Sequence, residues 1–478
     1  MKNRTLFFGL CALVATVGSL PLGGCSYVRA YKARAAYNEY QEAITAGDLL
    51  QARIALLKLV RTDEDVPDYW IELGKLQIQL GDYSAAYQAF SHAHELDRTN
   101  VEVLATLTQI ALMSRDLDLA STQARSLALV APDNPAVALV NGFVAYQSGD
   151  MDKAQKQAEN VLANAPNNSL ARILKARVLI QKNQAADAIA LLEDQHRTVP
   201  QDNGSIRALT LIYRLRGDWR NFARIQADAY RLDPKNSEAA QGMIEGLLRA
   251  GDVAAAGRLS VPLVSATASP EMVEQILAIW ARYAPKGAAL PNGDRLANAT
   301  TGDRRLSFAR YFNRTGKPAA AAALLGGSQL PITHTNAAWN ANVAQAMALQ
   351  GHTEDAKKLF DMVLDREPDQ TDALRGRSAL ETRTGSTRQA ALDAQRLVTI
   401  SPKTGEDRLL LAQAYLAARN GTQVRRTLWE AFQELPDDER VFAALKSVLA
   451  STGDVEGAQR LNDEIADRRT TKLTKELM

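Results

Sequence analysis

Cysteine, histidine and aromatic residues are scarce in this chain of 478 residues. It has two cysteines and five histidines, and Phe, Trp and Tyr together make up 6% of it. Cys11 lies in a segment that we expect to be removed, so the mature chain cannot form an intrachain disulfide. Hydrophobic residues reach 46%, which excludes an intrinsically disordered chain.

An excess of charge of either sign is also missing. Lys and Arg number 56, and Asp and Glu number 54. The expected leader contains Lys2 and Arg4 and no acid, so its removal leaves equal numbers of cationic and anionic side chains. Binding to nucleic acid depends on a field of positive charge, and we therefore expect no nucleic-acid partner.

The sequence lacks the motifs of the common catalytic sites. It has no HExxH zinc motif and no GxSxG nucleophile motif, and Gly316-Lys317 lacks the other residues of a phosphate-binding loop. His92 and His94 lie two residues apart on a predicted helix, so they point to different faces and do not form a chelate. We expect the five histidines on the surface. The sequence thus predicts no enzyme, no metal site, no cofactor and no small-molecule substrate.

The N-terminus has the pattern of a secretory leader. Lys2 and Arg4 precede an uncharged, mostly apolar run over residues 6–20, which is too short for a transmembrane span. Leu22-Gly23-Gly24-Cys25 follows and resembles the lipobox of bacterial lipoproteins. The resemblance implies that residues 1–24 are removed as a lipoprotein signal peptide and that Cys25 is acylated. Ser26 resembles the pattern sorted to the outer membrane, with the protein facing the periplasm. The alternative is an ordinary signal peptide with a chance cysteine.

Residues 25–32 are expected to form an acylated juxtamembrane segment. Over residues 26–40, basic side chains and tyrosines alternate in a way that suits lipid headgroups. The alternative is a first solenoid helix whose tyrosines pack inward.

A period of 34 residues runs through the rest of the chain. Gly-Asp pairs recur at multiples of this spacing, with Arg115-Asp116 and Asn183-Gln184 at the two steps that lack them. The pairs are Gly47-Asp48, Gly81-Asp82, Gly149-Asp150, Gly217-Asp218 and Gly251-Asp252. The prolines Pro132, Pro166, Pro200 and Pro234 keep the same period. The pattern predicts a helix, a tight turn at the glycine, and a second helix capped by the aspartate.

One copy shows the repeat most fully. The segment from Pro67 to Asn100 contains Trp70, Leu73-Gly74, Gly81-Asp82-Tyr83, Ala86, Phe90 and Ala93. It resembles the tetratricopeptide repeat (TPR) family, although Gln77 and Arg98 depart from the pattern. The resemblance implies an all-α fold, a right-handed superhelical solenoid of about twelve antiparallel helix pairs.

Breaks in the period divide the array. We expect an N-terminal TPR array over 33–270 and an irregular helix-loop insert over 271–301. A C-terminal array with a terminal helix follows over 302–478. Two prolines, two glycines and an Asn-Gly step in 285–301 predict a hinge or an exposed loop.

In the TPR family, the second, fifth, ninth and twelfth positions of each repeat face a concave groove. Carried onto three units of this chain, the positions predict a groove for a peptide with hydrophobic residues and carboxylates. Phe143 and Tyr146 are the expected anchors, and the arginines are the charge partners. The predicted site comprises Leu139, Phe143, Tyr146, Ile173, Arg177, Arg207 and Arg214. The alternative is that the aliphatic members pack between neighbouring units.

These features predict a lipid-anchored scaffold that binds protein partners of an envelope secretion or assembly complex. Its length favours exopolysaccharide export, because long scaffolds of that system resemble it more than compact pilotins do. The alternatives are a type IV or Tad-type pilus assembly lipoprotein, and a periplasmic chaperone that holds unfolded clients.

Overall fold

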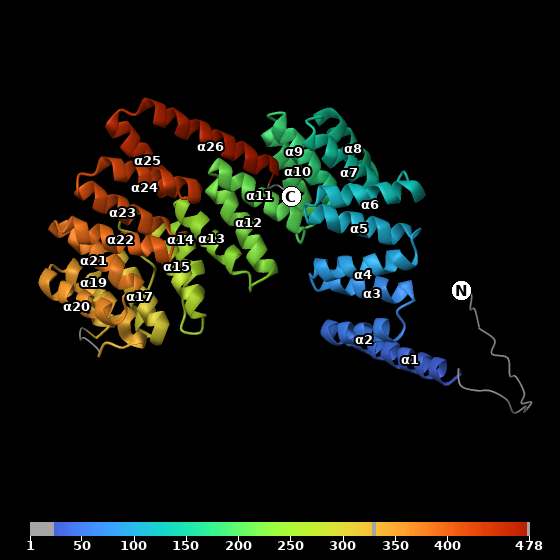
Figure 1. Cartoon of the computed structure of the whole chain (residues 1–478), viewed down its shortest axis with the longest axis horizontal. Coiled ribbons are helices and arrows are strands. Elements are labelled where there is room, and N and C mark those ends of the chain that lie inside the picture. The colour runs from blue at the N-terminus through green and yellow to red at the C-terminus, as the bar shows by residue number, and fades with distance from the viewer. Residues whose placement is uncertain (1–22, 327–330, 476–478) are drawn as a thin grey trace, which may run out of the picture. The chain divides into compact units, whose positions relative to one another are not determined.

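The computed structural model describes residues 23–326 and 331–475, and the regular elements in these ranges are all helical (Figure 1). The described residues form two compact units, divided between Val178 and Leu179 and here called the N-terminal and C-terminal units. Their boundary falls inside a helix of the predicted 33–270 array. Most of the predicted signal peptide, with Cys11, lies outside the described residues. No helix within 23–326 or 331–475 has the length and hydropathy that a membrane span needs.

The N-terminal unit consists of successive antiparallel helix pairs. Its helices are α1 (Gly23–Thr45), α2 (Leu49–Thr62), α3 (Pro67–Gln79), α4 (Tyr83–Leu96), α5 (Val101–Met113), α6 (Leu117–Val130), α7 (Pro135–Gln147), α8 (Met151–Asn164) and α9 (Ser169–Gln181), which crosses the boundary.

The C-terminal unit continues the same alternation. Its first helices are α10 (Ala185–Thr198), α11 (Asn203–Arg216), α12 (Trp219–Leu232), α13 (Ser237–Arg249), α14 (Val253–Leu263), α15 (Pro270–Tyr283), α16 (Gly293–Asn298) and α17 (Gly302–Arg314). The remaining helices are α18 (Pro318–Leu324), the 3-10 helix η1 (His334–Asn336), α19 (Ala337–Leu349), α20 (Thr353–Arg366), α21 (Thr371–Thr384), α22 (Thr387–Ile400), α23 (Gly405–Ala417), α24 (Gly421–Glu434), α25 (Glu439–Thr452) and α26 (Val455–Lys475). The predicted all-α solenoid of about twelve pairs is confirmed.

The turn inside each pair follows the predicted chemistry. Gly81 has a φ of 78°, and Arg115 and Asn183 adopt the same left-handed conformation, with φ of 61° and 60°, at the steps without glycine. The aspartate after the turn caps the second helix, as in Asp82, whose carboxylate accepts a hydrogen bond from the Ala85 N–H at 3.0 Å. The predicted capping role is confirmed at Asp48, Asp82, Asp116, Asp150, Asp218 and Asp252.

Helices within a pair approach closely because small residues face large ones. A Cβ atom on Gly74 would lie 2.6 Å from the fully buried ring of Phe90, so only glycine allows α3 and α4 this separation. The spacing of Gly74 and Phe90 within this repeat therefore has a packing cause.

The segment predicted as a hinge or exposed loop, 285–301, is exposed at most of its positions and is held against its neighbours at a few buried ones. α15 lies between α13 and α17, in the place of the first helix of a pair. Leu290 and Ala297 are buried, and the Leu290 N–H donates to the Tyr311 hydroxyl at 3.0 Å. Trp280 is also fully buried, and its indole N–H donates to the Ser260 hydroxyl at 2.8 Å. The apolar side chains of Leu290 and Ala297 hold this segment against its neighbours. The turn-forming residues in its sequence do not indicate these contacts.

Candidate binding groove

The predicted anchors in the N-terminal unit are not open to a ligand. Leu139, Phe143 and Ile173 are 1–2% exposed, and Tyr146 is 7% exposed. They lie on α7 and α9 and pack within the helical array rather than line a groove. The sequence-based role of Phe143 and Tyr146 as accessible anchors is therefore wrong for this conformation, because these aromatic rings fill space between helices.

Arg177 joins that packed cluster. Its guanidinium carbon lies 4.3 Å from the Tyr146 ring centroid and 5.8 Å from that of Phe143. Desolvation by burial lowers the pKa of Arg177 from its usual value, although Tyr146 opposes this effect. A cation stacked on aromatic faces stabilises the array, and Arg177 is buried away from an incoming carboxylate.

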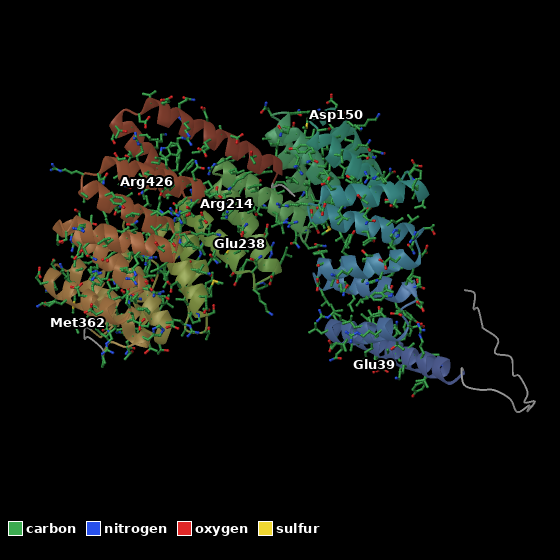
Figure 2. All side chains as sticks on the ribbon, in the orientation of Figure 1. Glu39, Asp150, Arg214, Glu238, Met362 and Arg426 are labelled. Atoms are coloured by element: carbon green, nitrogen blue, oxygen red, sulfur yellow. The ribbon has the colours of Figure 1, made fainter. Side chains whose placement is uncertain are left out.

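Arg207 and Arg214 have different surroundings. Both are exposed on α11 and line a cavity of about 210 Å³ between α11, α12 and α13. Figure 2 labels Arg214 on this helix. Glu238 on α13 lies on the same cavity. The Arg214 guanidinium also stacks on Phe222, with its carbon 4.9 Å from the ring centroid. These two predicted residues are accessible, but they belong to the C-terminal unit, whereas the other five lie in the N-terminal unit.

A larger groove lies on the first helices of five successive pairs in the C-terminal unit. Helices α17, α19, α21, α23 and α25 pack in that order and enclose a cavity of about 370 Å³. We call this cavity the C-terminal groove. Its lining residues are Arg310, Asn313, Arg314, Asn342, Gln345, Asp372, Arg375, Gly376, Ala379, Glu406, Leu409, Leu410, Gln413 and Arg440.

Arg310 and Asp372 form the centre of the groove. The Arg310 Nε and Nη2 atoms lie 2.9 and 2.7 Å from Asp372 Oδ2, and Nη1 lies 2.7 Å from Glu274 Oε2. The Asn342 amide donates to the same Asp372 oxygen at 3.0 Å. Burial alone would lower the pKa of Arg310, but Asp372 and Glu274 raise it above its usual value. The charged guanidinium and its partners thus join four helices, α15, α17, α19 and α21.

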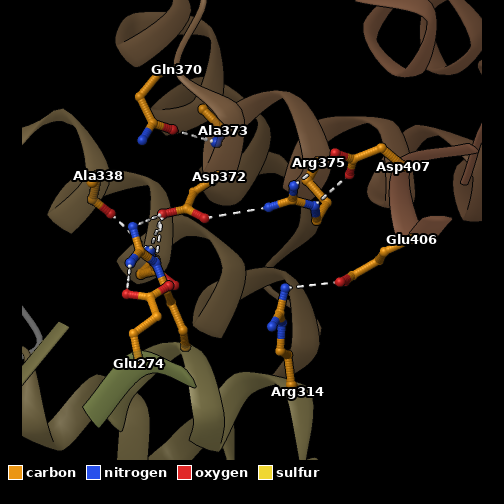
Figure 3. A network of polar contacts seen from close by, with 11 residues as sticks. Glu274, Arg314, Ala338, Gln370, Asp372, Ala373, Arg375, Glu406 and Asp407 are labelled. Carbon is orange, nitrogen blue, oxygen red and sulfur yellow. Dashed lines mark hydrogen bonds and ion pairs between the residues drawn. The ribbon is translucent and has the colours of Figure 1, made fainter. Parts of the chain in front are cut away.

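A second pair extends this network. Arg375 Nε and Nη2 lie 2.8 and 3.0 Å from the two oxygens of Asp407, in a bidentate contact (Figure 3). The Asp407 side chain is fully buried. Arg375 Nη1 also lies 3.6 Å from Asp372, so the network runs from α15 to α23. Because these groups saturate one another, they set the shape of the groove rather than offer contacts to a ligand.

Unused hydrogen-bonding capacity remains beside the network. The Arg314 Nη2 atom lies 2.9 Å from Glu406 Oε2, and both side chains are more than a third exposed (Figure 3). A guanidinium carries five N–H donors, so most of those on Arg314 face the groove or solvent. Asn313 is 6% exposed and donates to the Asn342 carbonyl at 3.1 Å, while its Oδ1 has no hydrogen-bond partner within the described ranges. The groove therefore offers cationic donors at Arg314, whereas the Asn313 Oδ1 is buried beneath its surface.

Ion pairs in the same unit join α13 and α15 to the start of α25. The Arg249 guanidinium on α13 contacts Glu439 at the start of α25, and its carbon lies 3.4 Å from the Trp219 ring centroid. Arg282 on α15 lies 3.1 Å from Asp438, which also binds Arg440. Burial would raise the pKa of Asp438, but the hydrogen bond from Arg440 and the charges of Arg282 and Arg440 lower it below its usual value.

The sequence contained a signal for this groove that the prediction did not use. With the repeat counted from Thr371 and Gly405, the second and fifth positions are Asp372, Arg375, Glu406 and Leu409, and the ninth positions are Ala379 and Gln413. All of them line the C-terminal groove. The predicted groove covers the units starting at 135, 169 and 203 and does not extend to these two.

Two other predictions concern single residues. Cys25, the predicted acylation site, is part of helix α1. For His196, the predicted position on the surface is wrong. The His196 side chain is 8% exposed, with Nε2 3.0 Å from Asp228 Oδ2, because α12 supplies a carboxylate beside α10. Among the described residues, no group of three or more His, Cys, Asp or Glu side chains could hold a metal ion.

The fold and the groove define a class, a helical repeat protein with a polar concave surface. Two family models agree with this class. The cytochrome c-type biogenesis protein H TPR domain matches residues 26–169, and the Psidin N-terminal TPR repeats region matches residues 143–270. Both describe TPR repeats, and the chain belongs to the tetratricopeptide-repeat family.

Several solved structures are similar to parts of the chain at low identity. MamA from Desulfovibrio magneticus RS-1 is 17% identical, with a TM-score of 0.30 over 36% of this chain and 98% of MamA. YrrB, a TPR protein with an unusual peptide-binding site, is 15% identical, with a TM-score of 0.29 over 37% of this chain and 94% of the YrrB chain. PilW, a type IV pilus biogenesis factor, is 16% identical, with a TM-score of 0.32 over 44% and 96%. No curated protein matches the chain.

Proposed function

We propose that this protein is a non-catalytic scaffold that holds a protein partner in the C-terminal groove. The observation that carries the proposal is the unused bonding capacity of that groove, above all the accessible Arg314, which uses one donor on Glu406. The remaining N–H donors of its guanidinium are open to a ligand in the groove. A ligand with a negative charge would bind them.

A peptide segment with an acidic side chain has this chemistry. Its carboxylate can replace Glu406 at Arg314, or compete with Asp438 for Arg440 at the opposite edge. The side chains of Gln345 and Gln413 lie on the same cavity and supply further amide groups for a peptide backbone. Arg207 and Arg214 offer two more exposed cations on α11 of the same unit.

The location of the scaffold is a further part of the proposal. Leu22-Gly23-Gly24-Cys25 after an apolar run supports acylation of Cys25 and an outer-membrane anchor that faces the periplasm. About twelve repeats support exopolysaccharide export as the pathway, since the long scaffolds of that system are closer in size than compact pilotins. A pilus assembly lipoprotein and a periplasmic chaperone remain the competing assignments, and the partner decides among them.

Charge reversal at the groove tests the scaffold function. We expect the Arg314→Glu, Arg440→Glu double variant to lose its main partner in co-purification from detergent-solubilised membranes, because both cations at the edges of the groove become repulsive to an acidic segment. Lys358→Glu, on the exposed side of α20, is the matched control and should retain the partner. Equal partner recovery from both variants would show that the groove is not the binding surface. Recovery of many unrelated denatured chains would favour the chaperone.

A further inference from the structure

Helix α1 joins the proposed lipid attachment site to the first repeat without a break. It runs from Gly23 to Thr45 and therefore includes Cys25. Arg29, four residues later, fastens this part of the helix to the end of α2. Its Nε donates to the Thr62 carbonyl at 2.8 Å, and Nη2 lies 2.7 Å from Asp63 and 3.2 Å from Asp65. An anchor at Cys25 would thus be attached to a fixed helix.

The two sides of α1 differ sharply in composition. Ala33, Ala36, Tyr40 and Ala43 are buried against the first repeat. On the other side, Val28 is 50% exposed and Tyr31 is 69% exposed, and Lys32, Arg34 and Ala35 are exposed as well. Residues 28, 31, 32 and 35 follow the helical spacing that gathers them on one side. We call Val28, Tyr31, Lys32, Arg34 and Ala35 the outer face of α1.

The charge of this outer face has one sign. From Gly23 to Asn38 the helix contains Arg29, Lys32 and Arg34 but no acid, and Glu39 is the first. Arg29 is engaged with α2, whereas the exposed Lys32 and Arg34 remain for an external anion. An exposed tyrosine beside exposed cations suits a phospholipid headgroup layer, which places aromatic rings at the interface and attracts Lys and Arg. The chain as a whole is close to neutral, so this concentration of positive charge is local.

The distance from Cys25 to Tyr31 decides how α1 is oriented relative to the membrane. Tyr31 follows Cys25 by six residues, which is about 9 Å along a helix axis. If α1 were perpendicular to the membrane, Tyr31 would lie beyond the headgroup layer. If α1 is parallel to the membrane surface, the whole outer face lies in that layer. Only the second arrangement buries Val28 and Tyr31 from water.

We propose that the outer face of α1 lies on the phospholipid surface, so that the first repeat is held directly against the membrane. This inference rests on the proposed acylation of Cys25. In the mature acylated protein no other thiol is left, because Cys11 is removed with the leader, and a single added cysteine can therefore carry an environment-sensitive fluorophore.

The test compares two labelled positions in the full-length acylated protein. Tyr31→Cys probes the outer face, and Leu50→Cys, 57% exposed at the start of α2, is the control. Leu50 lies on α2, which packs against the buried side of α1 and is therefore separated from the outer face by the width of that helix. On vesicles of phosphatidylethanolamine and phosphatidylglycerol with nitroxide-labelled headgroups, we expect a blue shift and quenching at position 31 and neither at position 50.

A charge variant adds a second measurement. Lys32→Glu with Arg34→Glu should weaken quenching at position 31 on these anionic vesicles and leave it unchanged on zwitterionic ones. Flotation of the protein with vesicles but no quenching at position 31, or equal quenching at 31 and 50, would overturn the proposed surface while the anchor stands. Failure to float would overturn the acylation proposal and this inference with it.

Discussion

Asp407→Ala is expected to destabilise the C-terminal unit by about 3–5 kcal/mol, the typical cost of removing one partner from a buried ion pair. The Asp407 side chain is fully buried and binds Arg375 through two hydrogen bonds. Without it, the half-buried Arg375 guanidinium keeps its charge and loses its main counter-ion. Native-state hydrogen exchange should show the loss as faster exchange in α21 and α23.

Asp369→Ala is the matched control for this prediction. Asp369 binds Arg396 at 2.7 Å, but the two side chains are 68% and 47% exposed, and an exposed pair contributes about 0–1 kcal/mol. If Asp407→Ala changed hydrogen exchange no more than Asp369→Ala, the polar network would not be what holds the groove in shape.

The second large effect concerns location. Cys25→Ser should move the protein entirely from the membrane fraction to the periplasmic fraction, because several acyl chains are lost and each buried methylene contributes about 0.8 kcal/mol. Fractionation and intact-mass measurement follow the change. Cys11→Ser, in the leader, should leave both the location and the mass unaltered. Membrane retention of the Cys25→Ser protein would contradict the lipid anchor.

The repeat architecture could be predicted from the sequence because it depends on local rules. Each repeat needs a left-handed residue at its turn, and in many copies an aspartate caps the next helix, so these residues recur every 34 positions. The left-handed conformation is kept even where Arg115 or Asn183 replaces glycine. The helix pairs follow from that period alone.

The site could be predicted only in part, because its contacts join residues far apart in the chain. Arg249 meets Glu439 across 190 residues, and Arg314 meets Glu406 across 92. The family register gives the groove positions, but it does not tell whether a side chain there is saturated, as Arg375 is, or available, as Arg314 is. Nor does it separate a ligand anchor from a packed ring such as Phe143.

Photocrosslinking in living cells tests the central claim most directly. A photoreactive amino acid at Gln413, which is exposed on α23 and lines the C-terminal groove, is compared with one at the exposed Lys358 on α20. The account predicts that Gln413 captures one component of an envelope complex and that Lys358 does not. The same diffuse set of products from both positions, or none from Gln413, would contradict the groove as the binding surface.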